Sequence, residues 1–537
     1  MSGTQQTQPD ALLQQGIRLD QAGQHDAAAA LYRKILEQQA DHAYASHLLG
    51  ANALRNGNPA AAVELISTAI RNNAHEPVFH FFLGQALQET GDLQGALSAY
   101  SLALSLAPRF PPAMFRRATV LVALQRLPEA LDNFRQALAA EPELGHTGLQ
   151  QARACKNRNE LDTARRLLHI VLEYHPHMRE AHVELGNVLL AQEQYDEARE
   201  IFARLFRLER GTGWGDAPFT EETTGDTGTG AEQLRASPFF FENLAGHIDY
   251  LVARGRLHGS FTGLAEIYRE FLAESTGRTN SQGLITLSPA QARRVQAVLP
   301  KALHYADSAP IPGAAVNPAL NGMDIQQDYR DSPWQMTCFD DFLTPEALNS
   351  LRDFCLESTI FFRQSPNTFV SSYLDEGFNC SILYQIASEL KATFPDVLGP
   401  LHLQNIWCYR QAPSGDGVRA HSDQAAVTFN FWITADDANL DKDSGGLVLY
   451  DREQPHEWDW YKTNYEKDNP EVLQRIMSYL QDANTKTIPY RENRAVMFYS
   501  NMFHRSDRFR FKRGYSNSRM NVTMLFGQHA SQTRRMS

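Results

Sequence analysis

The sequence predicts a multidomain chain: an all-α superhelical array, a helical connector and a β-rich domain. Three observations lead to this fold class. Small and large residues recur at a step of 34 over residues 1–210. This periodicity then stops in a segment rich in Gly, Thr and acidic residues, which opens a linker and connector over 211–333. From 334 to 530, short apolar segments alternate with turn signals, as is typical of a sandwich or barrel.

Composition and charge exclude several classes of protein. A chain of 537 residues is too long for one typical domain. The formal net charge of −12 argues against a general nucleic-acid binder, which needs a basic face. We expect no membrane-spanning helix, because no long apolar run occurs, and no secretory signal at the N-terminus. The five cysteines are scattered without a C-x-x-C pair, so we expect reduced thiols in a cytoplasmic protein.

Two columns of residues keep one register across the array. In each unit a small residue is followed, after an intervening alanine, by a larger and mostly apolar residue. The small residue lets one helix of an antiparallel pair approach the other, and the large one fills the gap to the next unit. The small column is Gly16, Gly50, Gly84, Ala118, Ala152 and Gly186, and the large column is Tyr32, Ile66, Tyr100, Phe134, Leu168 and Phe202.

Over residues 9–210 this array of six units resembles the tetratricopeptide repeat (TPR) family. The resemblance implies a concave groove that binds a peptide or another protein. Two other interpretations stay open: the array packs on the C-terminal domain of its own chain, or it makes a homo-oligomer. No nucleic-acid or membrane partner is expected.

The middle of the chain indicates a connector. Residues 211–230 lack apolar periodicity and read as a linker or exposed loop. The helical pattern returns over 231–275, which predicts two or three helices, and one interpretation is that they cap the array. Residues 306–333 are rich in Pro, Ala and Gly and predict an extended connector.

The β-rich domain begins near Trp334. Thr344 and Pro345 suit the N-cap and the first position of a helix that continues to Leu356. A further helix is predicted near 471–482. The predicted strands are 403–410, 426–434, 446–450, 487–490, 495–499 and 517–526.

A candidate metal site is carried by His421 and Asp423. On a strand these two side chains point the same way, while Ser422 points away. A second histidine from another strand, His504, would give three ligands on one face of an octahedron. This arrangement leaves positions for a bidentate co-substrate and dioxygen, as in non-haem Fe(II) oxygenases.

A later segment supplies candidate partners for an anionic co-substrate. Residues 519–526 alternate, with Arg519, Asn521 and Thr523 on one face and apolar side chains on the other. In an ordinary sheet the polar face is solvated, but in a small barrel it points inward. A guanidinium there can hold a carboxylate through two parallel hydrogen bonds. Thr523 and Tyr409 are further candidate donors.

Residues 334–527 resemble iron(II)- and 2-oxoglutarate-dependent dioxygenases of the prolyl-hydroxylase-like kind. The resemblance implies a double-stranded β-helix (jelly-roll) core, Fe(II), and 2-oxoglutarate and dioxygen as co-substrates. It also implies an oxidoreductase that hydroxylates a substrate, and the repeats favour a protein or peptide. The residues that match the family pattern are the metal ligands His421, Asp423 and His504 and the co-substrate residues Arg519 and Thr523.

Several alternatives stay open beside the oxygenase. One is a TPR interaction scaffold with an inactive domain, and another is a cupin-like enzyme that does not use 2-oxoglutarate. A glycosyltransferase is disfavoured, because no Gly-rich phosphate loop follows a strand. His402 and His456 lack a carboxylate two residues later, and we expect neither to bind metal. The insertion at 451–485 is either a surface excursion or a lid beside the iron.

Overall fold

The computed structural model describes residues 7–220, 234–274, 279–280, 283–306, 308, 310–365, 369–465 and 469–528. The chain divides into two compact units, Met1–Ala181 and His182–Ser537. Part of the linker predicted for 211–230 lies outside the described residues. The division falls within the sixth repeat, and the predicted domain limits at 210 and 333 stay predictions.

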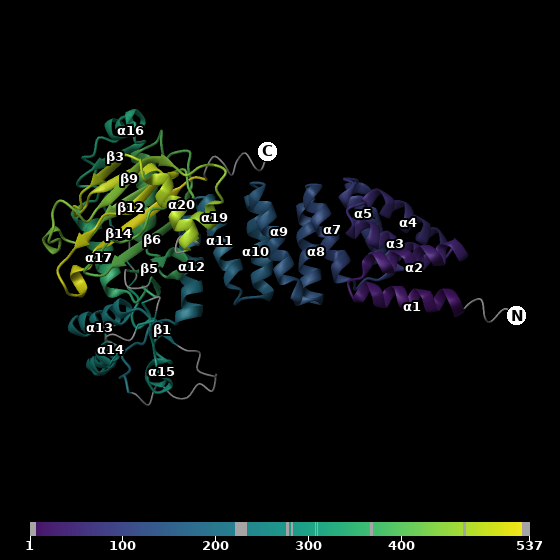
Figure 1. The fold of residues 1–537 in the computed structure, drawn as a ribbon, viewed down its shortest axis with the longest axis horizontal. Helices are drawn as coiled ribbons and strands as arrows, with labels where there is room; N and C mark the ends of the chain where they lie inside the picture. Colours follow the sequence, from purple (N-terminus) through teal and green to yellow (C-terminus); the bar gives the residue numbers. More distant parts are fainter. Residues whose placement is uncertain are drawn as a thin grey trace. The chain divides into compact units, whose positions relative to one another are not determined.

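The first unit consists of helix pairs, and each helix lies against the next along the chain (Figure 1). This confirms an all-helical repeat array in the N-terminal region. Its elements are α1 (Thr7–Gln21), α2 (His25–Gln38), α3 (Ala43–Arg55), α4 (Pro59–Asn72), α5 (Pro77–Glu89), α6 (Leu93–Leu106), α7 (Pro111–Ala123), α8 (Leu127–Ala140), η1 (Pro142–Leu144), α9 (Gly145–Asn157) and α10 (Leu161–Tyr174).

The third repeat shows why the sequence periodicity produces this packing. A Cβ added at Gly84 would lie 2.6 Å from the Tyr100 ring, so the small residue makes room for the large one. The turn between the two helices contains Gly91 with φ +86°, a conformation that favours glycine. Asp92 then caps α6 by accepting a hydrogen bond from the Gly95 N–H at 2.9 Å. The small and the large residues of the two sequence columns therefore contact each other between the paired helices.

The last helix of the array belongs to the second unit. The Asn379 side-chain amide donates to the Arg199 carbonyl at 2.9 Å, and the Phe206 ring fills the space beside Gly377, where a Cβ would clash. One interpretation was that the connector caps the array, and both the connector, through Ala302 and Tyr305, and the β-rich domain contact this helix. The elements that meet here are α12 (Tyr195–Arg210), which follows α11 (Arg179–Ala191), and η4 (Leu374–Glu376) and α18 (Ser381–Thr393).

The connector contains the expected helices and two, α15 and α16, that lie outside the segment predicted as helical. Residues 306–333 were predicted as extended, but a helix occupies Gly322–Asp331. Asn321 caps this helix by accepting a hydrogen bond from the Asp324 N–H, and Asn-Gly reads more readily as a turn. The connector elements are β1 (Arg235–Ala236), α13 (Pro238–Ala253), η3 (Gly259–Phe261), α14 (Thr262–Glu274), β2 (Ile285–Thr286), α15 (Pro289–Val295) and α16 (Gly322–Asp331).

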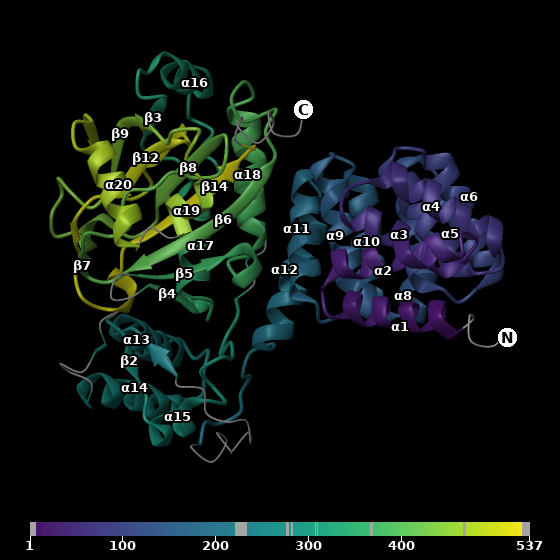
Figure 2. The same cartoon turned by 45° about the vertical axis from the view of Figure 1, so that its right-hand side comes forward.

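The C-terminal region is β-rich, and its named strands pair antiparallel in two main sheets. The larger sheet has the order β3-β11-β8-β14-β6-β5-β4 and the smaller one β10-β9-β12, while β13 pairs with β7. Figure 2 shows β8, β14 and β6 side by side. Among the described strands neither sheet closes into a barrel. The strands are β3 (Met336–Phe339), β4 (Arg363–Ser365), β5 (Phe369–Tyr373), β6 (Leu403–Gln411), β7 (Ser414–Gly415), β8 (Val427–Trp432), β9 (Leu447–Glu453), β10 (Thr485–Ile488), β11 (Ala495–Tyr499), β12 (Met502–Ser506), β13 (Phe509–Arg510) and β14 (Met520–Phe526).

All six predicted strand segments contain a strand, and a further run, which follows His504, was not among them. It contains the end of β12 and all of β13. The basic residues in this run hid an alternation in which Phe509 and Phe511 are buried while Arg508 and Arg510 are exposed. The two predicted helices are present as α17 (Pro345–Glu357) and α20 (Pro470–Leu480), whereas α18 and α19 (Trp460–Tyr465) were not predicted.

The larger sheet has an apolar face covered by helices and an opposite face that turns toward the candidate site. On β8, Phe429 packs against Phe342 at 4.9 Å between ring centroids, and Phe342 leads into α17. On β6, the Cys408 thiol lies beside Cys355 of α17. Since side chains alternate along a strand, the neighbours of these residues project to the opposite face.

Candidate metal centre

His421 and His504 are paired directly across two chain segments. The His421 N–H donates to the His504 carbonyl at 3.0 Å, and the His504 N–H donates to the His421 carbonyl at 2.8 Å. In a hydrogen-bonded antiparallel pair the two side chains leave on the same face. The imidazole centroids are consequently 4.3 Å apart.

Asp423 completes a cluster of three metal-binding groups. Its carboxylate oxygens lie 3.7 Å from Nε2 of His421 and 3.5 Å from Nε2 of His504. One ligand atom from each residue lies within 4.8 Å of the others, and within the described residues this is the one such group. The structure therefore brings together the three residues that the sequence placed around one ion.

The backbone sets the orientation of both imidazoles. Nδ1 of His421 lies 2.8 Å from the Arg419 carbonyl, and Nδ1 of His504 lies 3.1 Å from the Met502 carbonyl. A carbonyl can only accept, so each Nδ1 carries the proton and each Nε2 keeps its lone pair. In neutral imidazoles, the two Nε2 lone pairs and a carboxylate then converge. This is the donor set and the tautomer that a metal ion requires.

Neighbouring side chains hold Asp423 in place. The Thr428 hydroxyl donates to Asp423 Oδ2 at 2.9 Å and lies 2.9 Å from the Ser500 hydroxyl. Ser422 points the other way, as expected. Its hydroxyl donates to Gln454 at 2.8 Å, and its N–H donates to the side chain of Asn464 at 3.1 Å.

The inserted segment, 451–485, therefore contacts the segment 421–423 on the side to which Ser422 points. Asn464 belongs to α19, which lies within the insertion at 451–485. A second contact is made by Trp458, whose ring lies 6.3 Å from that of Phe503, the neighbour of a ligand histidine. These contacts join the insertion to the segment that carries the ligands, and the lid stays a prediction.

The three ligands open into a small cavity of about 30 Å³. This volume accommodates an ion or a water molecule and is smaller than a dicarboxylate. A co-substrate could enter only if side chains moved. The lining residues are Trp407, Tyr409, Val418, His421, Asp423, Asn430, Leu447, His504, Ser506, Asn521 and Thr523.

Two predicted co-substrate residues, Tyr409 and Thr523, line this cavity. The Tyr409 hydroxyl lies 3.2 Å from that of Tyr373 on β5. Burial raises the pKa of Tyr409 well above its usual value, so its hydroxyl stays protonated and can donate. Thr523 is 3% exposed and faces the same space from β14.

Arg519 lies beside the cavity and does not line it. Its guanidinium donates to the carbonyls of Gly445 and Gly446 and to the side-chain oxygens of Gln411 at 2.8 Å and Asn521 at 3.1 Å. All four acceptors are neutral. Burial lowers the pKa of Arg519 to about 10, and the side chain is 2% exposed. A two-bond grip on a carboxylate would require one of these neutral acceptors to give way.

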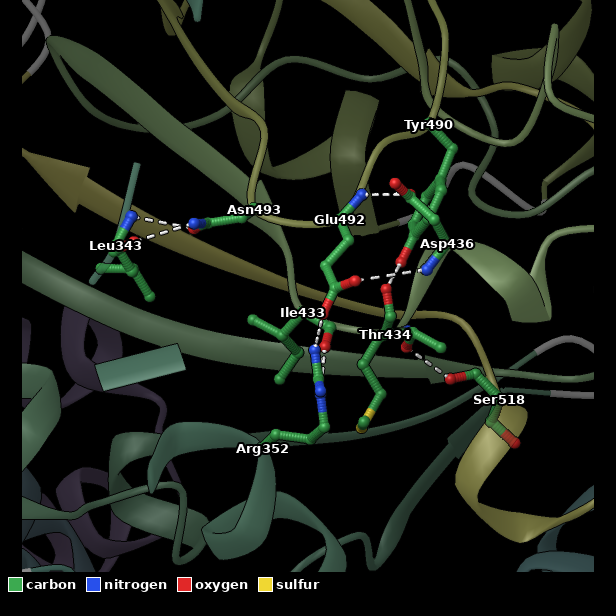
Figure 3. Close-up of polar contacts among 10 residues, drawn as sticks. Leu343, Arg352, Ile433, Thr434, Asp436, Tyr490, Glu492, Asn493 and Ser518 are labelled. Carbon is green, nitrogen blue, oxygen red and sulfur yellow. Dashed lines mark hydrogen bonds and ion pairs between the residues drawn. The ribbon is translucent and has the colours of Figure 1, made fainter. Parts of the chain in front are cut away.

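Figure 3 shows the contacts that hold the segment ahead of Arg519. The Thr434 hydroxyl donates to the Ser518 carbonyl at 2.8 Å and accepts from the Met520 N–H at 2.9 Å. The Tyr490 hydroxyl donates to the Thr434 carbonyl, and Arg352 donates to the Ile433 carbonyl at 2.7 Å. Side chains thus join the loop after β8 to the start of β14, and their hydrogen bonds satisfy backbone groups of both segments.

Two further residues of the cavity were missed by the sequence reasoning. Nε1 of Trp407 and Oδ1 of Asn430 are buried and have no hydrogen-bond partner among the described residues. One is a donor and the other an acceptor, as expected where a polar ligand completes a site. Asn430 alternates with Thr428 on β8, and this spacing was the available signal.

The comparisons with known proteins concern the first part of the chain. The family model described as Tetratricopeptide repeat matches residues 13–77, 47–113 and 149–208. The first part of the chain is an array of tetratricopeptide repeats. The matched segments end ahead of the β-rich region.

One curated relative is Protein CTR9 homolog of Arabidopsis thaliana, which is 31% identical over 127 residues. The match covers 24% of the chain and only 12% of that relative's length. Three solved structures are similar to part of the chain, with TM-scores below 0.3. The TPR protein TTC0263 of Thermus thermophilus is 24% identical, with 34% of this chain and 99% of that one covered and a TM-score of 0.27. Pseudomonas aeruginosa PilF is 20% identical, with 37% of this chain and 91% of that one covered and a TM-score of 0.29. The first TPR of Spaghetti (RPAP3) bound to an HSP90 peptide is 19% identical, with 22% of this chain and 94% of that one covered and a TM-score of 0.22.

These findings support a TPR protein-interaction scaffold, which was the alternative prediction. The oxygenase stays a prediction. In the part of the chain that the structure describes, no helix combines the length and apolar character needed to cross a membrane.

Proposed function

We propose that residues 334–530 form an Fe(II)- and 2-oxoglutarate-dependent oxygenase domain on a double-stranded β-helix (jelly-roll) core. The observation that carries this proposal is the convergence of His421, Asp423 and His504 with both Nε2 lone pairs directed toward the carboxylate. A set of two imidazoles and one carboxylate suits Fe(II) and leaves coordination positions open. The two packed antiparallel sheets are compatible with the proposed core.

In this proposal the chain's own residues orient the metal ligands and bind the co-substrate. Thr428 fixes the Asp423 carboxylate, and two backbone carbonyls fix the ligand tautomers. The positive charge of Arg519, surrounded by neutral acceptors, attracts the far carboxylate of 2-oxoglutarate, and Thr523 and Tyr409 offer hydroxyl donors. When bound, Fe(II) with 2-oxoglutarate and dioxygen supplies the oxidising power to hydroxylate a C–H bond.

The proposed substrate is a protein or peptide, and the TPR array captures it. The support is the repeat array itself, together with a solved TPR structure described as bound to an HSP90 peptide. A cytoplasmic location is part of this proposal. It is supported by the five cysteines, none of which forms a disulfide.

Iron-dependent turnover of 2-oxoglutarate tests the proposal. After anaerobic loading of the full chain with Fe(II), we expect oxygen-dependent formation of succinate. The variant His421→Ala should lose both iron binding and succinate formation, because one of three ligands is gone. The matched control is His456→Ala, which removes an exposed histidine outside the site and should leave both unchanged. A wild-type chain that binds no Fe(II) and forms no succinate would overturn the oxygenase.

The second candidate is a TPR scaffold whose β-rich domain is inactive or cupin-like. The observation that favours it is the family match, which is confined to the repeats. It predicts that a peptide captured by the array stays unmodified in the presence of Fe(II), 2-oxoglutarate and dioxygen. Mass spectrometry of the captured peptide distinguishes the two, since hydroxylation adds one oxygen atom.

A further inference from the structure

Gln454 contacts both chain segments that carry the metal ligands. It directly follows β9 and is 4% exposed. Its side-chain Oε1 accepts a hydrogen bond from the Ser422 hydroxyl at 2.8 Å. Its backbone N–H donates to the Asn501 carbonyl at 2.9 Å, and its carbonyl accepts from the Asn501 side-chain amide at 3.1 Å. Because Ser422 stands between His421 and Asp423, one residue joins the two ligand-carrying segments.

Asn464 closes the contact between Gln454 and Ser422 into a ring of hydrogen bonds. Its Nδ2 group donates to Gln454 Oε1 at 3.2 Å, and its Oδ1 accepts from the Ser422 N–H at 3.1 Å. All three residues are at most 9% exposed. Loss of the Gln454 oxygen would leave the Ser422 hydroxyl without this acceptor, which is costly at a buried position. The place of Ser422 therefore depends on the Gln454 amide.

The bonds between Gln454 and Asn501 hold β12 where its pairing with β9 is irregular. Met502 and His504 are two residues apart on β12, but their partners on β9 are four residues apart. Such an irregularity interrupts the regular ladder and redirects side chains. The bonds to Asn501 continue the pairing of Met502 on the far side of the irregularity from His504. They fix the segment from which the His504 side chain projects.

We propose that Gln454 is a positioning residue of the metal centre, which sets the spacing between the two segments that carry the ligands. Its amide fixes Ser422 between the first two ligands, and its backbone fixes the segment that leads to the third. Gln454 does not line the metal cavity, so it acts through Ser422 and Asn501. This inference rests on the metal centre of the proposed function, but it does not require the oxygenase chemistry.

Cobalt(II) is the probe for the test, because it binds the same kinds of ligand as Fe(II) and its visible absorption depends on coordination geometry. Titration of the full chain followed by absorption gives both the affinity and the band positions. In Gln454→Leu all three ligands remain, but the hydrogen-bond acceptor is gone. We expect the affinity for Co(II) to fall about tenfold, the lower end of the range for groups that orient metal ligands, and the bands to shift.

Gln326→Leu is the matched control. Gln326 is 1% exposed, lies in the same compact unit and accepts hydrogen bonds from the N–H groups of Asp396 and Val397, which are outside the metal site. The control should lower the melting temperature and leave the affinity for Co(II) and the band positions unchanged. This comparison separates a loss of stability from a change in ligand spacing.

Ser422→Ala is a milder variant that tests the same contact, and it stays informative if Gln454→Leu fails to fold. It should weaken Co(II) binding and shift the bands in the same direction as Gln454→Leu. The effects of the two changes should not add. In the double variant, Ser422→Ala should cause little further loss of affinity, because the hydroxyl already lacks its acceptor.

Unchanged Co(II) affinity and band positions in Ser422→Ala and in a folded Gln454→Leu would overturn the proposal. An equal loss of affinity in Gln326→Leu would also overturn it, because stability alone would then explain the effect. A wild type that binds no Co(II) would end both the metal centre and this role of Gln454. If the variants behave as expected but the Fe(II)-loaded wild type forms no succinate, the oxygenase fails and the positioning role is supported.

Discussion

At the scale of single residues, the candidate site depends on groups that do not themselves bind metal. The Arg419 and Met502 carbonyls set the protonation of two imidazoles, and the Thr428 hydroxyl sets the direction of one carboxylate. Such supporting bonds orient a ligand before an ion arrives, so less ordering remains to be done on binding. Removing one of these supporting hydrogen bonds should weaken metal binding although all three ligands remain.

Thr428→Val tests this support at Asp423. Valine keeps the shape of threonine and cannot donate to the carboxylate. We expect Fe(II) affinity to fall about tenfold, the lower end of the range for supporting residues, in anaerobic calorimetric titration of the full chain. Thr487→Val, at an exposed position on β10, is the control and should bind as the wild type does. Unchanged affinity in Thr428→Val would show that this hydrogen bond does not matter.

Arg519→Gln tests the proposed role of the buried cation. It removes the charge and keeps a side chain that can donate. If the guanidinium attracts 2-oxoglutarate, the KM for 2-oxoglutarate should rise roughly 30-fold, as expected for loss of one partner of a buried charge pair. Fe(II) affinity measured without co-substrate should stay the same. A KM equal to that of the wild type would exclude Arg519 from co-substrate binding.

The sequence predicted the site residues that follow a spacing rule and missed those that depend on tertiary contacts. His421 and Asp423 are two apart, and Arg519 and Thr523 share one face of a strand, so both pairs could be found by alternation. The alternation of Asn430 with Thr428 was a signal of this kind, but the role of Trp407 could not be derived this way, because whether a buried donor has a partner depends on neighbouring strands. Three of the four neutral acceptors of Arg519, on Gln411, Gly445 and Gly446, likewise lie far from it in sequence.

At the scale of elements, a turn of two glycines controls the approach of two strands. Gly445 has φ +88°, and a Cβ on Gly446 would lie 1.9 Å from the Ile488 carbonyl oxygen. The close approach lets β9 pair with β10 while the two glycine carbonyls accept from Arg519. The sequence did not indicate that this turn holds the guanidinium.

Gly446→Ala should therefore be strongly destabilising. The added methyl group cannot be accommodated unless the backbone moves, and we expect a loss of about 2–4 kcal/mol in the free energy of unfolding. Gly415→Ala is the control, because its Cβ would meet its nearest atom at 3.6 Å, an ordinary contact. Urea denaturation of both variants gives the comparison. Similar losses in the two would contradict a steric role for Gly446.

Within the repeats, His47 makes stability depend on pH. Its ring lies 4.7 Å from that of Phe79, and burial lowers the pKa of His47 to about 4. The unfolded chain has a pKa of about 6.5, so unfolding takes up a proton between these values. Stability should be complete above about pH 6.5 and fall by roughly 3 kcal/mol as the pH drops toward 4. His47→Leu should show a smaller fall between pH 7 and 4.5 in urea denaturation, and an identical fall would refute the assignment.

At the scale of the whole molecule, the repeat array and the β-rich domain share a helix. Helix α12 completes the sixth repeat, yet it is packed within the second compact unit, where Phe206 is 2% exposed. Sequence periodicity showed the repeat and its register. It could not show this packing, because nothing in a 34-residue period indicates what covers the last helix.

Phe206→Ala should weaken the second unit selectively. Loss of a buried phenylalanine costs about 3–5 kcal/mol, so the temperature at which the chain loses Fe(II) binding should fall. Phe134→Ala removes a phenylalanine that is equally buried in the first unit and serves as the matched control. It should leave the iron-binding temperature unchanged. Equal effects of the two variants would mean that the units do not unfold separately.

The shared helix also limits how the chain can change in length over evolution. A whole unit of 34 residues can be gained or lost upstream of α11 without touching the Asn379 bond to Arg199 or the space that Phe206 fills. An insertion after α12 would leave both of these contacts in place and would lengthen the segment between α12 and α13. The N-terminal end of the array is thus where relatives can differ in repeat number, while the last repeat is bound to the domain that follows it.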